Sequence, residues 1–179
     1  MDFTGKVALV TGGGNGIGRA TSAAFARHGA KVVVVDRDAA GAQATAGIIR
    51  QNGGEAMVVT ADVTRSDDVK AYVKAAIERF GRIDCFFNNA GIEGKVAAIA
   101  EYDEAVFDQV MNVNVKGIFL GLRHVLPEMI RQGSGAVVNT ASVAGLVGTP
   151  GCRLTWRRST PSSDSPRWRR VKSRARAFG

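Results

Sequence analysis

The chain has 179 residues, enough for one domain with a sizeable core, and its 45% hydrophobic content is ordinary for a globular protein. Its net charge of +8 is unevenly placed, because residues 1–150 hold 15 Lys/Arg and 15 Asp/Glu while residues 151–179 hold 9 Lys/Arg and one acid. A basic main body that binds nucleic acid is therefore excluded, and so is a membrane span, which needs about 20 apolar residues. Without a signal-like segment, metal-ligand spacing or disulfide framework, we expect a cytoplasmic protein with no metal site.

Short apolar runs rich in Val alternate with amphipathic stretches along residues 1–140. The predicted strands are 6–11, 31–36, 55–60, 83–88 and 135–140, and the predicted helices are 17–28, 38–51, 67–80 and 103–132. This alternation with short connections indicates an α/β fold, a Rossmann-type doubly wound parallel sheet with helices on both faces. The alternation stops near Pro150. We therefore predict one incomplete domain over residues 1–150, truncated after its fifth strand, and a basic, non-native tail over 151–179.

Polar and glycine residues near the helix ends give finer expectations. Ser66 is predicted to cap the N-terminus of the third helix, and Gly81 to stand just past its end. In the long fourth helix, Gly117 and Gly121 are one turn apart and would let another backbone approach closely.

The segment TGGGNGIG (11–18) connects the first predicted strand to the first predicted helix. Gly12 permits a tight turn, Gly16 lets a pyrophosphate approach the backbone, and Gly18 lets the helix pack on the strand. The helix N-terminus would add free N–H groups and a partial positive charge. Asp36 ends the second strand, where a carboxylate can bind the hydroxyls of an adenosine ribose. A plain glycine turn and a helix-capping Asp36 are the alternatives, but loop, context and acid together favour a dinucleotide-binding domain over 1–150.

The loop TGGGNGIG resembles the Thr-Gly-x-x-x-Gly-x-Gly loop of the short-chain dehydrogenase/reductase family, classical type. Matching motifs follow in the family's order: Asp62-Val63, NNAG (88–91), NVNVKG with Asn114, and VVNTASVAG with Ser142. The resemblance covers residues 1–150. It implies an NAD(P)-dependent oxidoreductase that interconverts a secondary alcohol and a ketone by hydride transfer.

The resemblance also implies individual roles. Asp62 and Val63 would contact the adenine ring, Asn114 would hold a water in a proton relay, and Ser142 would hydrogen-bond the substrate oxygen. Taken alone, NNAG is a turn of small residues, a mid-helix Asn is a packing residue and a Ser after a strand is a turn residue. The predicted cofactor-binding residues are Gly12, Asn15, Gly16, Ile17, Gly18, Asp36, Arg37, Asp62, Val63, Asn89, Ala90 and Gly91, and the predicted catalytic residues are Asn114 and Ser142.

The preferred cofactor follows from charge. Asp36 would repel the 2′-phosphate of NADP, and Asn15 is neutral where NADP-preferring relatives often place a basic residue. Arg37 is a signal in the opposite direction, because it could pair with that phosphate. We predict NAD as the cofactor and disfavour NADP.

Two catalytic residues of the family are missing. The family uses a Tyr as base and a Lys four residues later, because a phenol with a pKa of about 10 needs a nearby cation to act near neutrality. The family's spacing from Ser142 brings these positions to Thr155 and Ser159, which cannot do this work. Neither Tyr72 nor Tyr102 has a Lys four residues on, so they supply no substitute.

A shifted reading frame would explain the missing pair. GC-rich codons can be chosen for Cys152 to Pro161 so that the alternative frame, entered at Gly151, reads Leu-Pro-Ala-Tyr-Val-Ala-Ser-Lys-His-Ala. That peptide contains Tyr-x-x-x-Lys at the expected place. The codons are our choice, so the frameshift is a hypothesis that the coding DNA decides.

Three classes of function follow from these observations. The first is an NAD-dependent oxidoreductase by descent that is inactive as written. The second is a non-catalytic nucleotide-binding pseudoenzyme or fragment, and the third is nucleic-acid binding through the basic tail. The resemblance implies a small alcohol or ketone substrate and a homo-oligomer, although the loss of the helix after the fifth strand puts that assembly in question. No membrane partner is expected.

Overall fold

The computed structural model describes residues 1–97 and 99–142. They form a parallel sheet of five strands in the order β3-β2-β1-β4-β5. From β1 the chain first adds β2 and β3 on one side and then β4 and β5 on the other. This change of side is the signature of a doubly wound sheet and confirms the predicted α/β fold. The strands are β1 (Val7–Thr11), β2 (Lys31–Asp36), β3 (Ala56–Thr60), β4 (Cys85–Asn88) and β5 (Ala136–Asn139).

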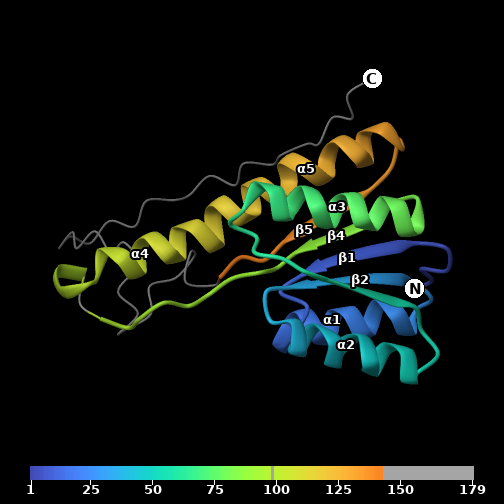
Figure 1. The fold of residues 1–179 in the computed structure, drawn as a ribbon, viewed down its shortest axis with the longest axis horizontal. Helices are drawn as coiled ribbons and strands as arrows, with labels where there is room; N and C mark the ends of the chain where they lie inside the picture. Colours follow the sequence, from blue (N-terminus) through green and yellow to red (C-terminus); the bar gives the residue numbers. More distant parts are fainter. Residues whose placement is uncertain (98, 143–179) are drawn as a thin grey trace, which may run out of the picture.

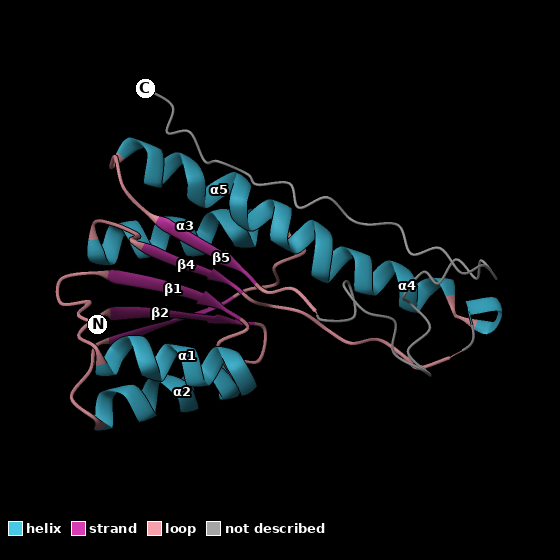
Figure 2. Cartoon of the chain, turned by 180° about the vertical axis from the view of Figure 1, so that it is seen from behind, coloured by secondary structure: helices cyan, strands magenta, loops and turns pink. Residues whose placement is uncertain are grey.

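Helices cover both faces of the sheet (Figures 1 and 2). Helices α1 and α2 lie on one face, and α3 and α5 lie on the other. The helices are α1 (Gly16–Arg27), α2 (Ala39–Gln51), α3 (Ser66–Phe80), α4 (Glu104–Met111) and α5 (Gly117–Arg131), with a short η1 (Ile99–Glu101) before α4 and a π-helical turn η2 (Asn112–Lys116) between α4 and α5.

The centre of the sheet is buried on both faces. Every residue of β1 is buried, as are the four valines of β2. Alternate residues face opposite layers, so Leu9 and Val33 pack toward α3 and α5, whereas Val10 and Val34 pack toward α1 and α2. These near-continuous apolar strands are typical of a parallel sheet covered on both sides. They hold the loops at the carboxyl ends of the strands in fixed positions.

The long helix predicted over 103–132 is interrupted in the structure. Its middle, Asn112–Lys116, forms the π-helical turn η2, and α4 and α5 continue the helix on either side. Helix α5 lies over β4 and β5, while α4 runs on past the carboxyl ends of the strands (Figure 1) and has no buried residue. The hydrophobic pattern of the sequence did not reveal this turn, because a π-helical turn changes the helical period for only a few residues.

Three finer expectations have different outcomes. Gly81 ends α3 in the left-handed conformation (φ 79°), as predicted. Ser66 is not the N-cap: Arg65 holds that position, and the Ser66 hydroxyl lies 3.0 Å from His124 Nε2 on α5. Gly121 is closely approached by side chains and not by the backbone that we expected, because a Cβ there would stand 2.9 Å from the Phe86 ring. Helix α5 is thereby seated against β4, which fixes η2 beside the carboxyl edge of the sheet.

Candidate functional site

The loop between β1 and α1 has a backbone that only glycine tolerates. Gly12 has a φ of 64°, and a Cβ on Gly18 would clash with the Gly12 carbonyl oxygen. Gly16 also has a positive φ, 47°, but a Cβ there would meet nothing within 4 Å. Gly12 and Gly18 are thus required by packing, whereas Gly16 leaves an open stretch of backbone in the loop.

The N-terminus of α1 meets the same loop. Its N-cap, Asn15, has an extended backbone, and its side chain makes no capping hydrogen bond. No acidic residue lies in the first turn of α1. The first-turn N–H groups and the positive end of the helix dipole are therefore available to a negatively charged ligand.

Asp36 is held at the end of β2 by two backbone N–H groups. Gly14 N donates to its Oδ2 at 2.8 Å, and Asp38 N donates to its Oδ1 at 2.9 Å. The N-cap of α2 is Asp38, so Asp36 does not have the capping role that was the structural alternative. A carboxylate has about four acceptor positions, so each oxygen of Asp36 can accept a further hydrogen bond from a ligand hydroxyl.

Two side chains that sequence reasoning missed brace the glycine loop. Arg19 Nε donates to the Gly14 carbonyl at 3.0 Å and to Thr45 Oγ1 at 3.1 Å. The Thr45 hydroxyl donates in turn to the Gly13 carbonyl at 2.9 Å. Thr45 comes from the middle of α2, so the contact links residues far apart in the chain. No local motif marks it.

Asp62 lies after β3 beside two arginines. Its burial acts to raise its pKa, but hydrogen bonds from Thr64 N and Thr64 Oγ1 and the charges of Arg37 and Arg65 outweigh that effect. The pKa of Asp62 is therefore below its usual value. Arg37 consequently faces a stable negative charge across the mouth of the cleft.

The NNAG segment joins three strand ends. Asn89 N donates to Thr11 Oγ1 at 2.9 Å, and Asn89 Nδ2 donates to the Thr11 carbonyl at 3.1 Å. The Thr140 hydroxyl after β5 donates to Asn89 Oδ1 at 3.0 Å. Asn89 therefore ties the ends of β1, β4 and β5 together. Thr140 was not singled out from the sequence.

Asn114 lies in the π-helical turn and binds the loop after NNAG. Its Nδ2 donates to the Ile92 carbonyl at 2.8 Å, and its Oδ1 accepts from Ile92 N at 2.9 Å. The amide thus makes a two-point contact with one residue of main chain. A Cβ on Gly91 would stand only 3.3 Å from Asn114 Oδ1, so the small residue keeps this contact close.

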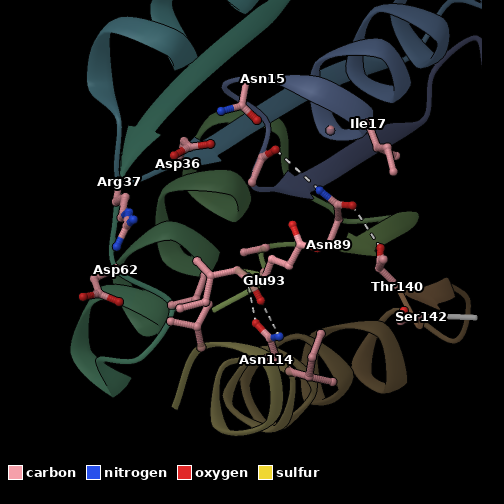
Figure 3. A pocket seen from close by; sticks show the side chains of 18 of the residues that line it. Asn15, Ile17, Asp36, Arg37, Asp62, Asn89, Glu93, Asn114, Thr140 and Ser142 are labelled. Atoms are coloured by element: carbon pink, nitrogen blue, oxygen red, sulfur yellow. Dashed lines mark hydrogen bonds between the residues drawn. The ribbon is translucent and has the colours of Figure 1, made fainter. Parts of the chain in front are cut away.

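A cleft of about 890 Å³ at the carboxyl edge of the sheet brings these residues together (Figure 3). One end, the loop end, is formed by Asp36, Arg37 and Asp62; the other, the helix end, is formed by Glu93, Asn114 and Ser142. Ile92, Glu93 and Thr140 also line it and were missed. The predicted residues in its lining are Gly12, Asn15, Ile17, Gly18, Asp36, Arg37, Asp62, Val63, Asn89, Ala90, Gly91, Asn114 and Ser142.

Of the other predicted residues, Gly16 is not part of that lining, whereas Ser142 is. Gly16 is in the loop but is not among the residues that line the cleft. Ser142 lines the cleft as an exposed residue after β5. Thr155 and Ser159, together with the predicted tail over 151–179, lie outside the described residues.

The described part of the chain was also searched for metal and membrane features. Within residues 1–97 and 99–142, no group of three or more His, Cys, Asp or Glu side chains is placed to hold a metal ion. None of the helices described there has the length and apolar character needed to cross a bilayer.

Comparison with known proteins identifies the family. The family model for short chain dehydrogenase matches residues 6–154. Levodione reductase from Leifsonia aquatica is 51% identical over 148 residues, which cover 82% of this chain and 55% of that protein. Cyclohexanol dehydrogenase from Acinetobacter sp. (strain SE19) is 40% identical over 146 residues, covering 82% of this chain and 58% of that protein. The chain belongs to the short chain dehydrogenase family, as the sequence motifs predicted.

Solved structures give the same result. A crystal structure of levodione reductase superposes with a TM-score of 0.81 at 48% identity, covering 84% of this chain and 59% of that chain. A crystal structure of an NAD⁺-bound xylitol dehydrogenase superposes with a TM-score of 0.82 at 38% identity, covering 85% and 58% respectively. The chain therefore spans less than two thirds of the length of these relatives. The family is one of oxidoreductases that bind a nicotinamide dinucleotide.

Proposed function

We propose that this chain carries the NAD-binding part of an oxidoreductase that interconverts a secondary alcohol and a ketone by hydride transfer. The observation that carries the proposal is the single cleft that holds Asp36 and Asp62 at one end and Asn114 and Ser142 at the other. The names of two relatives, cyclohexanol dehydrogenase and xylitol dehydrogenase, agree with a neutral alcohol as the substrate class.

The residues present fit a dinucleotide. The backbone at Gly16 is open, and the first turn of α1 offers N–H groups to a pyrophosphate. Asp36 has acceptor positions left for two ribose hydroxyls, beyond the bonds from Gly14 N and Asp38 N. When bound, NAD supplies the hydride acceptor. The chain's own residues hold its phosphates and its adenosine.

NAD is proposed over NADP on electrostatic grounds. Asp36 places a negative charge where a 2′-phosphate would lie, and such like charges repel strongly at short range. Arg37 could offset this, but it already faces Asp62, whose charge is stabilised by Thr64. The sequence left Arg37 as a signal for NADP, and its electrostatic attraction to Asp62 weakens that signal.

At the helix end, Asn114 and Ser142 are proposed to serve proton transfer and substrate binding. The Asn114 amide is occupied by Ile92, so a relay water would be held by the main-chain carbonyl of Asn114 and not by its side chain. A π-helical turn supports this role, because such turns alter the helical hydrogen-bond register and occur often at functional sites. Ser142 would donate to the substrate oxygen from its position after β5.

The chain as written is proposed to bind the cofactor without turning it over. Thr155 and Ser159 stand where the family's Tyr and Lys are expected, and neither can accept a proton near neutral pH or lower a neighbour's pKa. The family match ends at residue 154, next to Thr155, which supports a frameshift near Gly151. Sequencing of the coding DNA decides this: if no frame near Gly151 encodes Tyr-x-x-x-Lys, the frameshift proposal is wrong.

One pair of assays tests the functional proposal. NADH fluorescence is titrated with the full chain, and NAD reduction is followed with cyclohexanol and other secondary alcohols. Binding without turnover is the expected result and supports a nucleotide-binding protein related to dehydrogenases. Turnover would overturn the proposal that this chain is inactive, and the absence of NADH binding would overturn the dinucleotide site itself.

A further inference from the structure

Glu93 stands on a short loop that is fixed on both sides. On one side, Ile92 makes two main-chain hydrogen bonds to the Asn114 amide, at 2.8 and 2.9 Å. On the other side, Lys95 N donates to the Tyr102 hydroxyl at 3.2 Å. Gly94 between them has a φ of 79°, and a Cβ there would stand 2.6 Å from the same hydroxyl. The main chain around Glu93 is therefore positioned by the π-helical turn on one side and by the link between η1 and α4 on the other.

This loop turns the Glu93 side chain toward the cleft. Glu93 is one of the residues that line it, and Figure 3 places the side chain beside Asn114 and away from Asp36. Within the described residues, the Glu93 carboxylate has no hydrogen-bond or ion-pair partner. Among the described residues, the Glu93 charge therefore makes no contact that would stabilise the fold.

The two ends of the cleft differ in their balance of charge. At the loop end, the negative charges of Asp36 and Asp62 are joined by the positive charge of Arg37. At the helix end, Glu93 is the only residue with a charged side chain among the described residues that line the cleft. The helix end therefore has a net negative potential from one carboxylate on a fixed loop.

We propose that Glu93 is a specificity-determining residue that favours the oxidised over the reduced nicotinamide cofactor. This inference rests on the proposed function, in which the adenosine lies at the loop end and the nicotinamide at the helix end. The nicotinamide ring carries a positive charge in NAD⁺ and none in NADH. A carboxylate at that end attracts the first ring and not the second, so it shifts the relative affinity of the two forms.

The effect is modest, because Glu93 is exposed and water screens its charge. A unit charge that acts through a water-filled cleft over several ångströms changes an equilibrium by about threefold. NAD⁺ and NADH share their adenosine and pyrophosphate. The ratio of their dissociation constants therefore cancels every contribution except those at the nicotinamide.

The test compares the full chain with Glu93→Gln and with the control Glu101→Gln. Glu101 is an exposed glutamate in η1 that does not line the cleft, so its loss changes the net charge of the protein by the same amount. Calorimetric titrations with NAD⁺ and with NADH at low ionic strength give both dissociation constants for each protein. Thermal unfolding of each variant checks that the fold is retained.

We expect Glu93→Gln to raise the ratio of the NAD⁺ to the NADH dissociation constant by about threefold, with a smaller rise at 0.5 M salt. Glu101→Gln should leave the ratio unchanged. If both cofactors bind but the ratio is the same in Glu93→Gln, or changes equally in Glu101→Gln, the role of Glu93 is refuted and the proposed function stands. If neither cofactor binds to the parent chain, the proposed function and the role of Glu93 fail together.

Discussion

The two ends of the cleft are built in different ways. At the loop end, the glycine loop, Asp36 and Arg37 come from one continuous stretch from β1 through α1 to the end of β2, and Asp62 is added from the end of β3. Every residue of β1 is buried, and the glycine loop is closed by its own backbone. The helix end is assembled from the NNAG segment, the π-helical turn and the residues after β5. Strand β5 itself is less buried than β1, because its Val138 is 59% exposed. The contrast teaches that a nucleotide site can be encoded locally, whereas a reaction site depends on tertiary contacts between distant segments.

Substitution of Gly18 should produce the largest effect, at the loop end. In Gly18→Ala the new Cβ would clash with the Gly12 carbonyl oxygen, so the loop or helix α1 must move. We expect a loss of about 3 kcal/mol in the free energy of unfolding and a loss on the order of 100-fold in NADH affinity. Denaturant titration and NADH fluorescence measure the two quantities.

A matched control for Gly18→Ala is Gly47→Ala in the interior of α2. A Cβ on Gly47 meets nothing within 4 Å, and the residue has ordinary helical geometry. This variant should gain about 0.5–1 kcal/mol of stability and bind NADH as the parent does. Equal behaviour of the two alanine variants would mean that the loop does not need its glycines.

At the helix end, Asn114→Ala removes the two hydrogen bonds to Ile92. Each such bond contributes about 1 kcal/mol, so the free energy of unfolding should fall by about 2 kcal/mol. Amide exchange at Ile92 should become faster at the same time. Asn112→Ala in the same π-helical turn is the control, because Asn112 is exposed, and it should change stability by less than about 0.5 kcal/mol.

The fold was predictable because its signals are local. Five Val-rich runs alternate with amphipathic stretches, and each run became a strand of the parallel sheet within two residues of its predicted bounds. The glycine loop and Asp36 were found for the same reason, since their spacing is fixed within one βαβ unit. The hydrophobic period did not predict the π-helical turn, which changes the helical period over only a few residues. The capping pattern was wrong at Ser66, which contacts His124 instead of capping α3.

The candidate site was predictable in its list of residues and not in its contacts. Motif spacing identified Asn89 and Asn114, but not that Asn89 binds Thr140 or that Asn114 binds the main chain of Ile92. Arg19 and Thr45 carry no motif at all, because a helix residue that bonds to a loop carbonyl looks like any other polar residue. Such partners are set by how helices pack on the sheet, which the local sequence does not encode.

A change at Asp36 tests whether charge sets cofactor preference at the loop end. Asp36→Asn keeps the shape of the side chain but removes the negative charge, and its single carbonyl oxygen can accept from only one of the N–H groups of Gly14 and Asp38. NADH affinity should fall about tenfold, because hydrogen bonds to a charged acceptor are stronger, while NADPH affinity should rise. Competition titrations measure both, with Asp38→Asn as a control outside the cleft. A NADPH affinity that stays unchanged would show that Asp36 does not discriminate by charge.

The smallest expected effect tests how firmly the helix end is held. Tyr102→Phe removes the hydroxyl that accepts from Lys95 N, so the Glu93 loop should loosen at a cost of about 1 kcal/mol in stability. Exchange of the Lys95 amide should become faster.

Tyr72→Phe is the opposite case: the Tyr72 hydroxyl is buried with no hydrogen-bond partner in the described part of the chain, so its removal should be neutral or stabilising. Because burial raises the pKa of Tyr72 above its usual value, this phenol stays neutral at all ordinary pH values and adds no pH dependence to the comparison. If the two phenylalanine variants lose equal stability, then the Tyr102 hydroxyl is not what positions the loop.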